Sequence, residues 1–191
     1  MNQDSIIKIA EVMKERFNDF LVTLSSEDLE GVKDVYAGCF WVGCAEHYDY
    51  LVAEFSWNTN LGWEIHRKRP SNRSLHNNHR WMRENWEWHP ECPHSCNTSV
   101  ELLNCSQSSD SELQAAIQAD MNDDYFRVHE MFIQILTDEI GPYFRNHRVV
   151  TASGIAGIPL FMEIDGDEDY PQDVEDALNP NGETEDIFEP W

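Results

Sequence analysis

The chain has 191 residues, 41% hydrophobic and 12% aromatic, which is enough to bury a substantial core within one domain. Its 36 acidic and 13 basic side chains give a formal charge of −23, which disfavours direct binding to nucleic acid or anionic lipid and favours a basic partner. The sequence contains no run of about 18 apolar residues to predict a membrane span, and its five cysteines, an odd number, favour a reducing cytoplasm.

An N-terminal helix and a β-hairpin are the first predicted elements. Apolar residues recur at three- and four-residue steps over residues 6–24, which predicts an amphipathic helix rather than a signal peptide. Two β-rich runs, residues 35–44 and 50–57, flank a short polar stretch and predict a hairpin. We expect Cys39 and Cys44 to act as small core residues rather than as nucleophiles.

Helices dominate the predictions for the middle of the chain. Residues 58–109 are rich in Asn, Ser, His, Pro and Trp, and short helices are predicted there over residues 75–88 and 98–105, the second with Asn97 or Thr98 as its N-cap. The longest helical pattern covers residues 111–144, with a break expected near Asn122. The Gly-Pro pair at 141–142 predicts an interruption.

The C-terminal part is predicted to add strands, a short helix and a tail. Residues 149–164 predict one or two strands, the clearest at 158–164, and residues 154–157 predict a turn rather than a phosphate loop. A short helix is expected over residues 172–178. The elements together predict an α+β fold, with a mostly antiparallel sheet packed against the N-terminal helix and the long central helix. We expect a single domain over residues 1–180 and an acidic C-terminal tail at 181–191.

Several short motifs support a family resemblance. They are the strand Val35-Tyr-Ala-Gly-Cys-Phe40, the pair Arg80-Trp81 with Glu84, the cluster Asn85-Trp-Glu-Trp88, the strand Leu160-Phe-Met-Glu-Ile164 and the closing Ala177-Leu-Asn-Pro180. With the order of elements, they resemble a family of bacterial proteins designated only as a domain of unknown function, whose genes lie near polymorphic-toxin immunity genes. The resemblance implies a cytoplasmic binding role such as toxin neutralisation. The His- and Cys-rich insertion at 89–96 and the acidic tail depart from that family.

A loop rich in His and Cys is the candidate metal site. Imidazole and thiolate are the preferred zinc donors, and the spacing of Cys92 and Cys96 is permissible in a zinc-binding loop. The candidate ligands are His89, Cys92, His94 and Cys96, with His76 and His79 nearby. Two prolines restrict this loop and it has no Cys-x-x-Cys knuckle, so an ordinary polar loop is the alternative. We therefore expect no cofactor, with zinc as the one candidate.

Acidic and aromatic side chains are the candidate partner-binding residues. They are Asp165, Asp167, Glu168, Asp169 and Tyr170, together with Trp81, Trp86 and Trp88 beside a cluster of arginines. Carboxylates would steer a basic partner, and arginine with tryptophan is typical of interface hot spots. The alternatives are a solvated acidic turn, a calcium loop whose spacing does not fit, a nucleic-acid stacking patch that the overall charge disfavours, and tryptophans that serve only the core.

The leading functional hypothesis is therefore a protein-binding inhibitor of immunity type rather than an enzyme. Its carboxylates would neutralise a basic toxin by stoichiometric binding, with rapid, electrostatically steered association. The first alternative is a DNA mimic that blocks a nucleic-acid-binding site, and the second is a zinc-binding or thiol enzyme that uses the His/Cys loop. The sequence has neither a Gly-x-Ser-x-Gly elbow nor a Walker loop.

Overall fold

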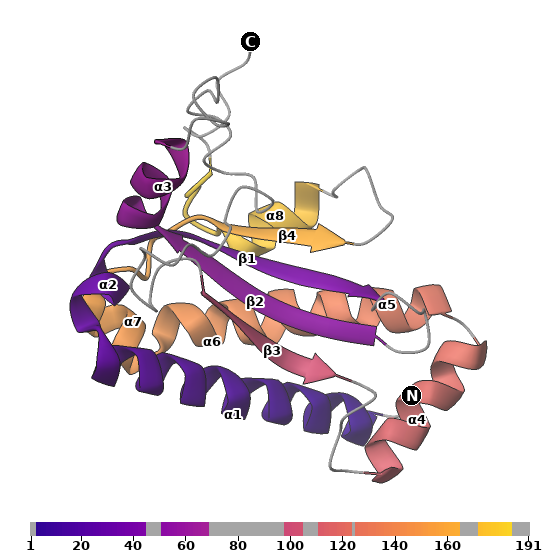
Figure 1. Cartoon of the computed structure of the whole chain (residues 1–191). Helices are drawn as coiled ribbons and strands as arrows, with labels where there is room; N and C mark the ends of the chain where they lie inside the picture. Colours follow the sequence, from indigo (N-terminus) through magenta and orange to yellow (C-terminus); the bar gives the residue numbers. More distant parts are fainter. Residues whose placement is uncertain are drawn as a thin grey trace.

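The computed structural model describes residues 3–44, 51–68, 98–104, 111–123, 125–164 and 172–184. These residues form a four-stranded sheet in the order β3-β2-β1-β4, with helices packed around it (Figure 1). The strands are β1 (Val35–Cys44), β2 (Leu51–Thr59), β3 (Thr98–Asn104) and β4 (Leu160–Ile164). The helices are α1 (Gln3–Glu27), α2 (Leu29–Lys33), α3 (Asn60–Arg67), α4 (Ser111–Asp123), α5 (Tyr125–Ile135), the π-helical turn η4 (Leu136–Ile140), α6 (Gly141–Asn146), α7 (Arg148–Ser153) and α8 (Gln172–Leu178).

The predicted hairpin forms the centre of the sheet. Strand β1 pairs antiparallel with β2, β2 pairs antiparallel with β3, and β4 is the one described strand that pairs in parallel, with β1. Side chains of β1 alternate between the two faces of the sheet, and both faces are covered, which fits a central strand. Phe40 and Val42 pack in the main core, whereas Cys39 packs in a second cluster with Trp63 of α3. The predicted α+β fold with a mostly antiparallel sheet is confirmed, and Cys39 is buried as expected.

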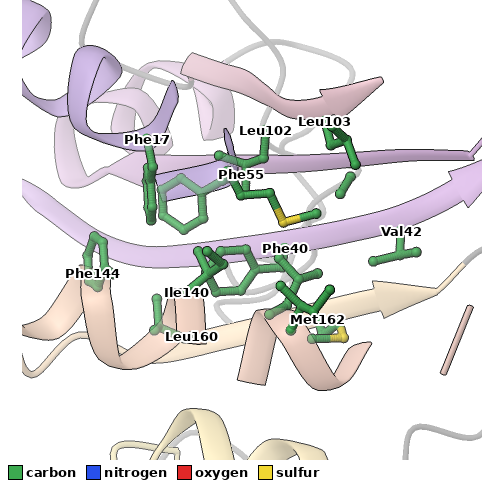
Figure 2. Close-up of a cluster of buried hydrophobic side chains, with 14 of the residues drawn as sticks. Phe17, Phe40, Val42, Phe55, Leu102, Leu103, Ile140, Phe144, Leu160 and Met162 are labelled. Carbon is green, nitrogen blue, oxygen red and sulfur yellow. The ribbon is translucent and has the colours of Figure 1, made fainter. Parts of the chain in front are cut away.

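Helix α1 and the helices that follow α4 cover one face of the sheet, as predicted (Figure 1). The buried residues of α1 recur every three or four positions, which gives the helix one apolar stripe. Figure 2 shows Phe17 and Phe144 directed toward the sheet residues Phe40 and Phe55. All four rings are fully buried, and the ring centroid of Phe17 lies 4.7 Å from that of Phe55 and 5.8 Å from that of Phe144.

The prediction of a helix over residues 98–105 is wrong, because residues 98–104 form strand β3, which pairs with β2. The pairing shifts register between Glu101, opposite Glu54, and Leu103, opposite Ala53, so Leu102 is the extra residue of a bulge. Both Leu102 and Leu103 are fully buried in the main core. Two consecutive inward leucines fit a strand only because the bulge turns both of them toward the same face.

The long helical region departs from prediction at its C-terminal end. The expected break near Asn122 falls where α4 ends at Asp123 and α5 begins at Tyr125. The Gly-Pro pair does not interrupt the helical path, because a π-helical turn precedes it and Pro142 occupies the first turn of α6, where no backbone N–H is needed.

The region after α6 was predicted with too much strand and too little helix. Residues 148–153 form α7, which ends at Gly154 in the left-handed conformation with φ of 75°, so the predicted turn is confirmed but an additional strand is not. Strand β4 and helix α8 form as predicted. Helix α3 was not predicted; Thr59 caps it by accepting a hydrogen bond from the Gly62 N–H at 3.0 Å.

Candidate protein-binding site

Every residue predicted to bind a partner or a metal lies outside the described residues. These are Asp165, Asp167, Glu168, Asp169, Tyr170, Trp81, Trp86, Trp88, His89, Cys92, His94 and Cys96. Those assignments stay predictions. Within the described residues, no group of three or more His, Cys, Asp or Glu side chains is placed to hold a metal ion. No described helix is long and apolar enough to cross a membrane.

A groove of about 470 Å³ lies between α1 and the edge strand β3. Both elements run alongside each other in Figure 1. Its floor is apolar: Phe20 and Val100 are partly buried and pack against the main core, and Leu24 is buried beside them. The Phe20 ring centroid lies 5.1 Å from that of Trp57. The lining residues are Arg16, Asp19, Phe20, Thr23, Leu24, Ser99, Val100 and Glu101.

One polar wall of this groove joins α1 to β3. Arg16 Nη1 lies 3.6 Å from Glu101 Oε1 and donates to the backbone oxygen of Glu101 at 3.4 Å. Asn104 holds the same carboxylate by donating to Oε2 at 2.9 Å. A half-exposed ion pair of this kind contributes only about 0–1 kcal/mol to stability. The contacts of Arg16 with Glu101 also hold β3 in place beside α1.

An acidic row lies on the exposed side of α1, and its last member, Asp19, lines the groove. It consists of Glu11, Glu15 and Asp19, which are spaced four residues apart and all exposed. Like charges at this spacing destabilise a helix by about 0.2–0.5 kcal/mol per pair. Within the described part of the chain, none of the three forms an ion pair, and Asp19 also lines the groove. The row therefore does not hold the helix together by ion pairing.

The buried charges near the β4 edge of the sheet have a structural role instead. Arg145 pairs with Glu183 at 3.0 Å and donates to the backbone oxygens of Ala156 and Leu178. Burial lowers the pKa of Arg145, and the charge of Glu183 opposes that shift. Burial alone would raise the pKa of Glu183, but hydrogen bonds from Asn181 and the charge of Arg145 bring it below its usual value. This network holds Glu183, which belongs to the predicted tail, against α6.

His147 is a second buried polar group whose contacts are structural. Its Nδ1 accepts the Val149 N–H at 3.3 Å and so caps α7, and its Nε2 lies 3.2 Å from Asn18 Oδ1 on α1. Because Nδ1 is an acceptor, the neutral ring carries its proton on Nε2 and donates it to Asn18. Burial lowers the pKa of His147, and the nearby charge of Arg148 lowers it further. The neutral ring therefore suits both contacts.

Sequence reasoning missed the groove and the acidic row for different reasons. The row was visible, since Glu11, Glu15 and Asp19 recur at helical spacing on the polar side of the predicted N-terminal helix. The groove was hidden because Val100 and Glu101 were assigned to a helix. Only the pairing of β3 with β2 places these two residues beside α1.

Comparison of the chain with models of protein families, with curated proteins and with solved structures gave no match. The site is therefore interpreted from its own geometry, in which an apolar groove lies between α1 and β3 and the acidic row of α1 reaches that groove at Asp19.

Proposed function

We propose that this protein is a stoichiometric inhibitor of immunity type, which binds a basic protein such as a toxin in the cytoplasm. The observation that carries the proposal is the apolar groove between α1 and β3, which the acidic row of α1 reaches at Asp19. Apolar contact area surrounded by polar and charged groups is the usual composition of a protein interface. The formal charge of −23 supports rapid association with a basic partner.

A mimic of DNA needs carboxylates at phosphate-like separations along one face. The acidic row holds only Glu11, Glu15 and Asp19 and ends at an apolar groove, whereas a phosphate backbone is charged along its whole length. The groove therefore favours a protein-contact surface over a mimic of DNA. The alternative of a zinc-binding or thiol enzyme depends on residues outside the described ranges and stays a prediction.

The test is kinetic and uses the product of the gene that neighbours the coding sequence as the partner. The variant Glu15→Gln/Asp19→Asn should slow association and flatten its salt dependence, because long-range attraction acts mainly on encounter. The matched control Asp173→Asn/Asp176→Asn removes the same charge from exposed positions of α8 and should have a smaller effect. Failure of the unmodified protein to bind that product at micromolar concentration would contradict the proposed function.

A further inference from the structure

The segment after α8 contains the one Asn-Gly pair of the sequence, Asn181-Gly182. Asn181 is exposed, and the backbone nitrogen that follows it belongs to a residue without a Cβ. Because no side chain hinders that nitrogen, it reaches the side-chain carbonyl of the preceding asparagine more easily than the nitrogen of any other residue type does. The pair is therefore the position of this chain at which an asparagine side chain is most prone to attack by its own backbone.

Both reacting groups of this pair are engaged in hydrogen bonds in the folded chain. The Gly182 N–H donates to the Asn179 C=O at 3.0 Å, which closes a turn over residues 179–182. The side-chain amide of Asn181 donates to Glu183 Oε1 at 3.0 Å, and its backbone N–H donates to Glu183 Oε2 at 3.0 Å. The glycine nitrogen must lose its proton and the asparagine side chain must turn toward it before they react. The closed turn therefore opposes the reaction.

Arg145 of α6 holds this turn closed from both of its ends. Its Nη1 lies 3.0 Å from Glu183 Oε1, and the two side chains are only 12% and 7% exposed. Its Nη2 donates to the Leu178 C=O at 2.5 Å and to Asn179 Oδ1 at 3.2 Å. One buried guanidinium thus contacts the residues before the Asn-Gly pair and the residue after it. We call Arg145 and Glu183, with the turn between Asn179 and Gly182, the C-terminal clamp.

We propose that Asn181 is a site of spontaneous deamidation that the C-terminal clamp holds in check, so that the reaction proceeds from molecules in which the clamp has opened. The Gly182 nitrogen then attacks Cγ of Asn181, an N–Cγ bond forms and the Cγ–Nδ2 bond breaks. Nδ2 leaves as ammonia with the proton that the Gly182 nitrogen gives up, and a cyclic imide remains. Water opens the imide at Cγ to give aspartate, or at the main-chain carbonyl to give isoaspartate. Nothing is oxidised or reduced in either step.

The product carboxylate opposes closure of the clamp. It stands where the Asn181 amide donates to Glu183 at 3.0 Å, so a second negative charge replaces a hydrogen-bond donor. Two carboxylates at this separation repel each other, which raises the pKa of Glu183 and weakens its pairing with Arg145. The ammonia is lost to solvent, so the change is not reversed. The modified residue is therefore a one-way record that the clamp has opened.

Deamidation rates of the full-length protein in mildly alkaline buffer test this role of the clamp. Mass spectrometry follows the conversion of Asn181 in the folded protein and in guanidinium chloride, and the ratio of the two rates gives the protection by the fold. We expect more than tenfold protection, and Glu183→Gln should reduce it about tenfold, because a neutral acceptor pairs more weakly with Arg145. The matched control Glu11→Gln, exposed on α1, should leave the ratio unchanged. Taking the ratio removes any effect of a substitution on the chemistry itself.

Amide hydrogen exchange of the unmodified protein gives a second test that needs no substitution. Exchange and deamidation both require release of the Gly182 N–H from the Asn179 C=O, so deamidation should be protected at least as strongly as exchange of that amide. The variant Asn181→Asp, which reproduces one product, should speed amide exchange in residues 178–182. Equal deamidation rates in the folded and unfolded chain, or unchanged protection in Glu183→Gln, would overturn the inference. Deamidation less protected than Gly182 exchange, or unchanged exchange in Asn181→Asp, would also overturn it.

Discussion

Asn179 is expected to be one of the most sensitive polar positions in the protein. Its side chain satisfies both backbone groups of Leu160 and also donates to the Glu175 C=O at 2.9 Å. Leu160 is fully buried, so Asn179→Ala would leave its N–H and C=O without partners and without water. Each buried group left unsatisfied costs about 1–3 kcal/mol. The free energy of unfolding should therefore fall by about 2–6 kcal/mol, a large part of the roughly 5–15 kcal/mol typical of a domain.

Urea unfolding followed by tryptophan fluorescence measures this loss, provided that the dependence on urea concentration is unchanged. The matched control is Asn146→Ala, because Asn146 is exposed and its amide donates to the Pro142 C=O at 2.8 Å. The control should cost less than about 0.5 kcal/mol, as is usual for surface changes. If Asn179→Ala costs no more than the control, the edge of β4 does not depend on this side chain and the reasoning fails.

Three further substitutions test the core and the helix cap. Phe17→Ala should lower the free energy of unfolding by about 3–5 kcal/mol in urea, because the ring is fully buried against Phe55; a loss below about 1 kcal/mol would contradict its place in the core. Gly38→Ala should cost about 1–3 kcal/mol by thermal unfolding, since a Cβ there would lie 2.8 Å from Phe55 Cζ, and an unchanged midpoint would show that the ring moves aside. His147→Asn should reduce the loss of stability on acidification, because Asn caps without titrating. Burial lowers the pKa of His147, so the unfolded chain is protonated first and this contribution is complete above about pH 6.5 and falls below it. Equal slopes between pH 7 and 5.5 for both proteins would exclude that role.

The elements predicted correctly are those in which the spacing of apolar residues indicates which face is buried. Helix α1 repeats apolar residues along one stripe, and β1 alternates between two buried faces, so local periodicity was sufficient for both. The prediction of a helix over residues 98–105 was wrong because the local sequence favours one. Thr98-x-x-Glu101 is the signature of a capped helix, and Val100 and Leu103 stand at helical spacing. Pairing with β2 outweighed that local preference, and the bulge at Leu102 cannot be predicted from spacing alone.

Only part of the candidate site could be predicted from the sequence. The carboxylates of α1 could be placed on one helix face from their spacing. The groove needs β3 next to α1, and these elements are separated by the whole hairpin and α3. Such contacts between distant segments depend on the sheet order, which no local pattern specifies.

The parallel pairing of β1 with β4 has a consequence for synthesis of the chain. Gly38 pairs with Leu160, more than one hundred residues later, whereas the β1–β2 ladder closes across the short stretch between Cys44 and Leu51. Because contacts between distant residues form slowly, the ladder should appear first and β4 should dock late. At about 5–20 residues per second, β4 leaves the ribosome roughly ten seconds after β1. During that interval the edge of β1 that later pairs with β4 lacks its partner strand, which makes the ribosome-bound chain the form most exposed to aggregation.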